Sequence, residues 1–171
     1  MNDQQRRDMA RKVLSVLYGT WVSHGHQSLN ALIDAEQWDK RVFDDVIQSL
    51  ERDHGLVKLD GVPNVFDLTP KGVLYAEENG IATEDEVSQH RAARAHVLSY
   101  LANLYDTEGS RAHAIYHEIA KGAPVRHELD ILVDIDLLRD LDYVEAVSSN
   151  SYRITRDGLR FHRGENYSDI V

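Results

Sequence analysis

The chain has 171 residues, no cysteine, 42% hydrophobic residues and a formal net charge of −10. This length fits one domain or two small ones with compact cores, and the lack of cysteine excludes disulfides, thiol nucleophiles and cysteine-based zinc sites. No apolar run approaches the roughly 18 residues needed to span a membrane, and the polar first residues lack the apolar stretch of a signal peptide, so we expect a cytoplasmic protein without membrane contact.

The first half of the chain predicts three helices, a β-hairpin and a trailing helix. Apolar residues at three- and four-residue spacing indicate a first helix ending at His24-Gly25-His26, and further helices over 28–35 and 38–53. The pattern then alternates over 56–68 around a turn at 61–64, which is typical of a hairpin. Thr69 can cap the last helix, whose first turn accepts Pro70.

The second half predicts the same order of elements. A long first helix runs to about Tyr105, a second helix spans 111–121 and a third spans 124–140. A hairpin follows over 143–154, and Thr155 caps a short last helix. The residues expected to face inward on the third helix are Leu129, Leu132, Leu138 and Leu141.

The two halves also match residue by residue at some places. The segment TPKGVLY at 69–75 corresponds to TRDGLRF at 155–161, and VLSVL at 13–17 corresponds to VLSYL at 97–101. Self-similarity at a fixed period is the signature of a duplicated unit. We therefore predict two tandem units, residues 1–82 and 83–171.

This list of parts resembles the winged helix-turn-helix domain. Segments 43–72 and 132–158 are similar to the third helix, wing and Thr-x-x-Gly boundary of many archaeal and bacterial winged-helix proteins. The resemblance implies a mainly α, α+β fold of two winged-helix units, each with three helices, a two-stranded wing and a trailing helix. It implies no single ligand, because winged helices serve as DNA readers, as adaptors in polymerase or chromosome complexes, and as dimerisation modules.

In DNA-binding members of this superfamily, the third helix enters the major groove and the wing touches the neighbouring backbone. On the first unit, the resemblance gives this role to Lys40, Arg41 and Gln48. Lys40 and Arg41 would lie at the end facing the groove and Gln48 could pair with an adenine, whereas Asp44 and Asp45 would repel phosphate. A solvated helix face with scattered charges is an equally good interpretation.

One compact basic cluster lies near the end of the chain, in Arg153, Arg156, Arg160 and Arg163. The first three would lie on the second wing and its trailing helix, where winged-helix proteins often touch backbone phosphate. The alternative is that these arginines pair with nearby aspartates, which the net charge of −10 favours.

The third helix of the second unit carries aspartates where a DNA reader would carry cations. It also has more apolar residues than one core-facing stripe requires, which indicates burial against the other unit or a partner. We interpret this helix as a protein interface that includes Ile131, Asp134 and Ile135.

The histidines and carboxylates show no complete chemical site. His113 and His117 lie four residues apart, and His24 and His26 flank a glycine, but neither pair has a placed third ligand, so we expect no metal. The sequence has no phosphate-binding glycine loop, nucleophile elbow or His-Glu-x-x-His pattern. We therefore expect neither an enzyme nor a cofactor.

These observations predict a DNA-binding, transcription-regulator-like protein. It would act as a homodimer on double-stranded DNA, because a single winged helix reads few base pairs and symmetric operators need symmetric readers. The alternative is an acidic tandem winged-helix adaptor that binds protein without direct DNA contact, similar to the kleisin-interacting subunits of chromosome-organising complexes. Salt-dependent duplex binding would distinguish the two.

Overall fold

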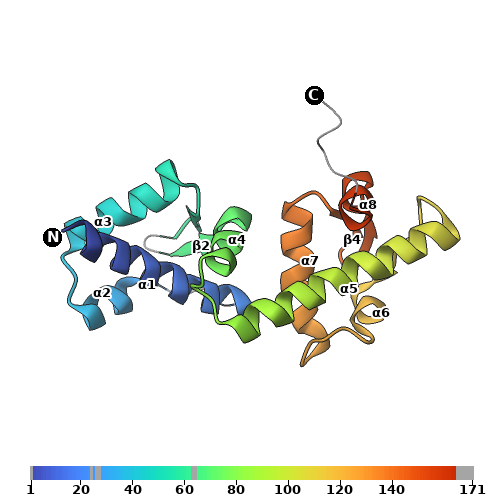
Figure 1. The fold of residues 1–171 in the computed structure, drawn as a ribbon, viewed down its shortest axis with the longest axis horizontal. Coiled ribbons are helices and arrows are strands. Elements are labelled where there is room, and N and C mark those ends of the chain that lie inside the picture. The colour runs from blue at the N-terminus through green and yellow to red at the C-terminus, as the bar shows by residue number, and fades with distance from the viewer. Residues whose placement is uncertain (1, 24, 26–27, 63–64, 165–171) are drawn as a thin grey trace. The chain divides into compact units, whose positions relative to one another are not determined.

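The computed structural model describes residues 2–23, 25, 28–62 and 65–164. The chain divides into two compact units, Met1–Glu84 and Asp85–Val171 (Figure 1). Both are mainly helical and carry small antiparallel sheets, so the predicted α+β class is confirmed. In the described residues, no helix combines the length and apolar character that crossing a bilayer requires.

Unit 1 places its helices before and after a short hairpin (Figure 1). Its elements are α1 (Asp3–Val22), α2 (Asn30–Glu36), α3 (Lys40–Gln48), a π-helical turn (Ser49–Asp53), β1 (Val57–Leu59), β2 (Phe66–Leu68) and α4 (Pro70–Glu78). The strands pair antiparallel with Lys58 opposite Asp67, and an isolated antiparallel bridge joins Ser28 to Val65. The predicted hairpin is therefore present, and residues 63 and 64 of the predicted turn lie outside the described residues.

The core of unit 1 forms where α1 packs against α3, α4 and β2. Leu17, Phe43 and Val73 supply one fully buried side chain from each of the three helices. Leu17 and Phe43 belong to the apolar stripes that helical periodicity predicts, because positions three and four apart share one face. The third helix begins at Lys40, where the Asp39 carboxylate accepts hydrogen bonds from the backbone amides of Arg41 and Val42.

Unit 2 repeats this order with a longer first helix and a three-stranded sheet. Its elements are α5 (Glu84–Glu108), β3 (Ala114–Ile115), α6 (Tyr116–Ala120), a 3-10 turn (Glu128–Asp130), α7 (Ile131–Asp140), β4 (Val144–Ser148), β5 (Ser151–Ile154) and α8 (Arg156–His162). The strand order is β3-β5-β4, with Ala114 opposite Tyr152 and Val144 opposite Ile154. The core gathers side chains from α5, α6, α7 and the sheet, including Leu101, Ile119 and Ile135.

Two of the predicted helices in unit 2 are shorter than expected. The helix predicted over 111–121 is wrong at its start, because Ala114–Ile115 pairs with β5 and only Tyr116–Ala120 is helical. The helix predicted over 124–140 begins only at the 3-10 turn, after a loop that contains Pro124. In the first segment, pairing with the distant strand β5 overrides the local helical pattern, and in the second the Asp130 carboxylate accepts the His127 amide at the start of the 3-10 turn.

The predicted inward stripe of the third helix is also partly wrong. Leu129 is 56% exposed, whereas Leu138 is buried as predicted. The residues that reach the core of unit 2 are Ile131, Ile135 and Leu138, spaced by four and three residues. The helix starts later than expected, so Leu129 precedes α7 and falls off its core-facing stripe.

The Thr-x-x-Gly boundary has the same geometry in both units. The Thr69 hydroxyl donates to the Gly55 carbonyl at 2.7 Å and accepts the Gly72 amide at 3.0 Å. The Thr155 hydroxyl donates to the Asp142 carbonyl at 2.6 Å and likewise accepts the Gly158 amide at 3.0 Å. Each threonine therefore caps a helix and ties its start to the segment before the hairpin.

Candidate functional site

The predicted DNA-reading residues of unit 1 lie on α3, and all three are exposed. The Lys40 Nζ atom lies 3.5 Å from a carboxylate oxygen of Asp44, one turn along the same helix. In the part of the chain that the structure describes, no hydrogen bond or ion pair engages the side chains of Arg41 and Gln48. Arg41 and Gln48 are seven residues apart and therefore share one face of the helix.

The carboxylates of this face are also held in ion pairs. Asp45 lies 3.5 Å from the Arg6 guanidinium of α1, and both side chains are well exposed. An exposed ion pair stabilises a protein by about 0–1 kcal/mol, so a competing phosphate can replace one at small cost. The face thus presents one unpaired guanidinium and one unpaired amide beside two carboxylates that already have cationic partners.

The predicted arginine cluster of unit 2 lies on β5 and α8, and most of it is neutralised. The Arg153 Nε atom donates to Glu145 on the facing strand at 2.6 Å, and this hydrogen bond, with the charge of Glu145, raises the pKa of Arg153. Arg160 lies 3.8 Å from Asp157, and Arg163 donates to Asp106 of α5 at 2.7 Å.

Arg156 is the exception in this cluster. It is exposed at the start of α8, and no ion pair or hydrogen bond of its side chain appears within the described residues. The structure therefore supports the alternative interpretation for three of the four arginines, and leaves Arg156 available to an anion.

The three predicted interface residues are inside unit 2. Ile131, Asp134 and Ile135 of α7 each have 0% of their surface exposed, and the two isoleucines belong to the core of the unit. Val133 and Leu137 of the same helix are buried as well. The side chains of Ile131, Asp134 and Ile135 therefore do not form an exposed patch that a partner could contact.

Asp134 instead takes part in a buried charged cluster that sequence reasoning missed. One carboxylate oxygen lies 2.9 Å from the His90 Nδ1 atom, and the other lies 3.5 Å from a guanidinium nitrogen of Arg94. All three residues are less than 9% exposed. The signal in the sequence is His90 and Arg94 at i and i+4 on α5, together with an aspartate inside an apolar run.

Of the histidine pairs considered for metal binding, the structure describes His113 and His117, and these two are not assembled into a site. His117 of α6 contacts Glu128 at 2.5 Å, and the His113 ring contacts the Arg111 carbonyl at 3.3 Å. His24 and His26 lie outside the described residues. Throughout the described ranges, no three side chains of the types that bind metals gather in a suitable arrangement.

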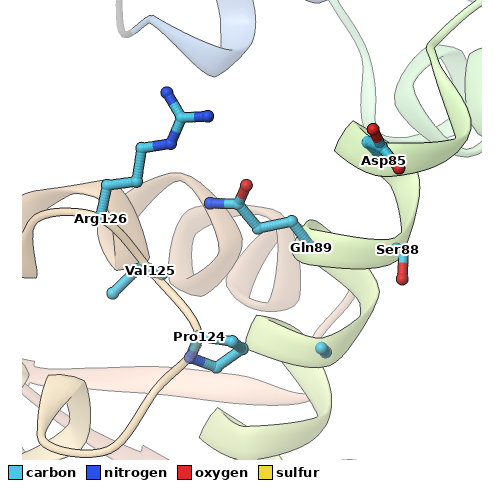
Figure 2. Close-up of a pocket in the computed structure, with 7 residues that line it drawn as sticks. Asp85, Ser88, Gln89, Pro124, Val125 and Arg126 are labelled. Carbon is cyan, nitrogen blue, oxygen red and sulfur yellow. The ribbon is translucent and has the colours of Figure 1, made fainter.

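Unit 2 also has an open hollow of about 450 Å³, which the sequence did not indicate (Figure 2). One wall is a single face of α5, and the other is the loop that precedes the 3-10 turn. The lining residues are Asp85, Ser88, Gln89, Ala92, Pro124, Val125 and Arg126. Its volume lies within the range of about 300–1,000 Å³ that is usual for small-molecule sites.

No protein-family model matches this chain, and comparisons with curated proteins and with solved structures found no significant match. Its function is therefore inferred from its own residues and geometry.

Proposed function

We propose that the chain is a tandem winged-helix protein that binds double-stranded DNA in transcription regulation. The order of elements in unit 2 supports the winged-helix assignment: a helix, a short strand, two helices, a hairpin and a trailing helix. In unit 1, the Ser28–Val65 bridge occupies the place that β3 holds in unit 2. The matching Thr69 and Thr155 caps further support two copies of one domain.

The observation that carries DNA binding is the exposed face of α3. Arg41 and Gln48 share this face and have no partners within the described residues. Arginine reads guanine and glutamine reads adenine through paired hydrogen bonds in the major groove. We therefore assign base contacts to α3, with Lys40 close to the phosphates at its first turn.

The backbone contacts are assigned to the arginines of unit 2. Arg156 has no side-chain partner within the described residues, so it can bind a phosphate directly. Arg153 and Arg160 would each replace their carboxylate partner with a phosphate. α7 receives no role as a reader, because most of the helix is buried. A homodimer would supply a second α3 for a symmetric operator.

The test is fluorescence anisotropy of a labelled random duplex, with the full chain, over a range of salt concentrations. We expect binding that weakens as salt rises, because phosphate contacts release counterions. Arg156→Ala should weaken binding to all sequences and lower the salt slope by about one, and Arg41→Ala/Gln48→Ala should weaken selection among sequences.

The matched control is Arg111→Ala, which removes an exposed arginine outside both surfaces. It should leave affinity and salt slope unchanged apart from a small effect of net charge. Absence of duplex binding at low salt would overturn the DNA-binding proposal.

A second candidate is the protein adaptor that makes no DNA contact. The pairing of Arg153, Arg160 and Arg163 with carboxylates favours it, together with the net charge of −10. An adaptor would copurify with a protein partner in fixed ratio and would leave the duplex unbound at every salt concentration.

A further inference from the structure

The hollow of unit 2 has two walls that are each held in place by contacts outside it. Asp85, Ser88, Gln89 and Ala92 are spaced by three, one and three residues, so they form one face of α5. The opposite wall is Pro124, Val125 and Arg126 (Figure 2). The hollow thus joins a rigid helix to a loop rather than two mobile segments.

The loop wall is restrained at both of its ends. On one side, the Ala123 and Val125 amides donate to the Ala120 and Ala123 carbonyls at 3.1 and 2.9 Å. On the other side, the His127 amide donates to the Asp130 carboxylate at 3.0 Å. A site whose walls are fixed in advance loses little conformational entropy when it binds a ligand.

Two contacts also fasten this loop region to neighbouring elements. The His117–Glu128 pair links α6 to the 3-10 turn, so it spans the loop. The His96 ring of α5 contacts the Ile119 carbonyl at 2.8 Å, which ties the end of α6 to the helix that supplies the first wall. These two contacts connect α6 to α5 and to the 3-10 turn that follows the loop.

The polar groups around the hollow are not used by the fold. Within the described part of the chain, no ion pair or side-chain hydrogen bond engages Asp85, Ser88, Gln89 or Arg126. Pro124, Val125 and Ala92 add an apolar surface beside them. A few polar groups beside apolar side chains are characteristic of small-molecule sites.

The two charged residues lie at separate places on the rim. Figure 2 shows the Arg126 guanidinium on one side of the hollow, the Asp85 carboxylate on the other and the Gln89 amide between them. A guanidinium binds a carboxylate through two parallel hydrogen bonds, and a carboxylate binds an ammonium group. A ligand that contacts both groups therefore carries its carboxylate and its ammonium group at opposite ends.

We propose that this hollow binds a linear zwitterion with a carboxylate at one end and a primary amine at the other, separated by a short apolar chain. Arg126 binds the carboxylate, Asp85 binds the ammonium group, and the chain lies against Pro124 and Val125. Gln89 donates to the carboxylate from the middle of the hollow. This binding site is independent of the proposed DNA contacts, because it shares no residue with them.

Isothermal titration calorimetry of the full chain with ε-aminocaproate tests the proposal. We expect saturable binding, and we expect Arg126→Gln and Asp85→Asn each to weaken it by about tenfold, since each removes a hydrogen bond to a charged group. Glycine, whose charges share one carbon, should not bind. The matched control variants are Lys121→Gln and Glu84→Gln, which remove exposed charges near the hollow but not in its lining.

Two ligands that each carry only one of the two charges test which residue binds which end of the zwitterion. Caproate should lose affinity with Arg126→Gln and be insensitive to Asp85→Asn, and hexylamine should show the reverse. The proposal is overturned if ε-aminocaproate gives no saturable heat up to about 10 mM, tenfold above a dissociation constant of about 1 mM. It is also overturned if the control variants weaken binding as much as the lining variants do.

Discussion

Gly72 and Gly158 lie where any side chain would collide with the backbone of their own unit. A Cβ atom on Gly72 would be 2.0 Å from the Leu56 carbonyl oxygen, and one on Gly158 would be 2.0 Å from that of Tyr143. The same carbonyls accept the amides of Thr69 and Thr155 at 3.0 Å. The helix can approach the chain before the hairpin this closely only because glycine has no Cβ atom.

We predict that Gly158→Ala lowers the free energy of unfolding by at least about 2 kcal/mol, because the backbone must shift to admit the methyl group. Urea unfolding followed by circular dichroism measures this change. Gly19→Ala is the matched control, because a Cβ atom there meets nothing within 4 Å. Since Gly19 lies inside α1, its replacement should raise stability by about 0.5–1 kcal/mol.

Equal stability of Gly158→Ala and the unchanged chain would contradict the close approach of α8 to Tyr143. A loss in both glycine variants would instead indicate a general sensitivity of the fold to added methyl groups.

At the scale of elements, the most consequential pair is α5 and α7. The Asp134 carboxylate of α7 lies between His90 and Arg94 of α5, and all three are buried. Buried charges are costly to remove from water, so they persist only when partners with good geometry compensate them. The cluster therefore specifies how the two helices meet more than it adds to stability.

We predict that Asp134→Ala lowers the free energy of unfolding by about 3–5 kcal/mol, because it removes the carboxylate that compensates two buried basic side chains. The control is Asp136→Ala on the same helix, which breaks only an exposed pair with Arg139. That variant should change stability by at most about 1 kcal/mol. Urea unfolding measures the free energy of unfolding of both variants. Equal decreases in the two variants would show that the buried contacts of Asp134 stabilise the fold no more than the exposed pair does.

At the scale of the whole molecule, the surplus of carboxylates is the dominant electrostatic property. The chain has 29 acidic and 19 basic residues, and some of the exposed basic side chains, such as those of Arg6, Lys40 and Arg163, are already paired with carboxylates. The remaining acidic groups repel one another, and this repulsion destabilises the compact state. Salt screens charges on the surface beyond a distance of about 10 Å at 0.1 M.

We therefore predict that the midpoint of thermal unfolding rises when sodium chloride is increased from about 0.01 M to 1 M, because screening weakens the net repulsion. Differential scanning calorimetry measures the midpoint. Sucrose is the uncharged comparison, since it stabilises by exclusion from the surface and leaves charge repulsion intact. A midpoint that falls with salt would show that the exposed ion pairs outweigh the repulsion.

Local patterns in the sequence were sufficient for most of the helices, for the two hairpins and for the two caps. Helical periodicity, a threonine at a helix start and a glycine three residues later act over a few residues, and the structure has Thr69 and Thr155 where these patterns place them. The mainly helical α+β class follows from the same local signals. Boundaries such as that of the third helix in unit 2 were less accurate, because its 3-10 start depends on the Asp130 cap.

Other properties depend on contacts between segments far apart in the chain, so patterns within short sequence segments did not predict them. Ala114–Ile115 is a strand because β5 pairs with it, and Arg163 is neutralised by Asp106, 57 residues away. Asp134 was interpreted as part of a protein interface, and only the fold shows that its carboxylate contacts His90 of α5. The availability of a charge to a ligand is set by its neighbours in space, so the charge pattern favoured pairing of the arginine cluster but could not show which arginine stays unpaired, and it gave no sign of the hollow.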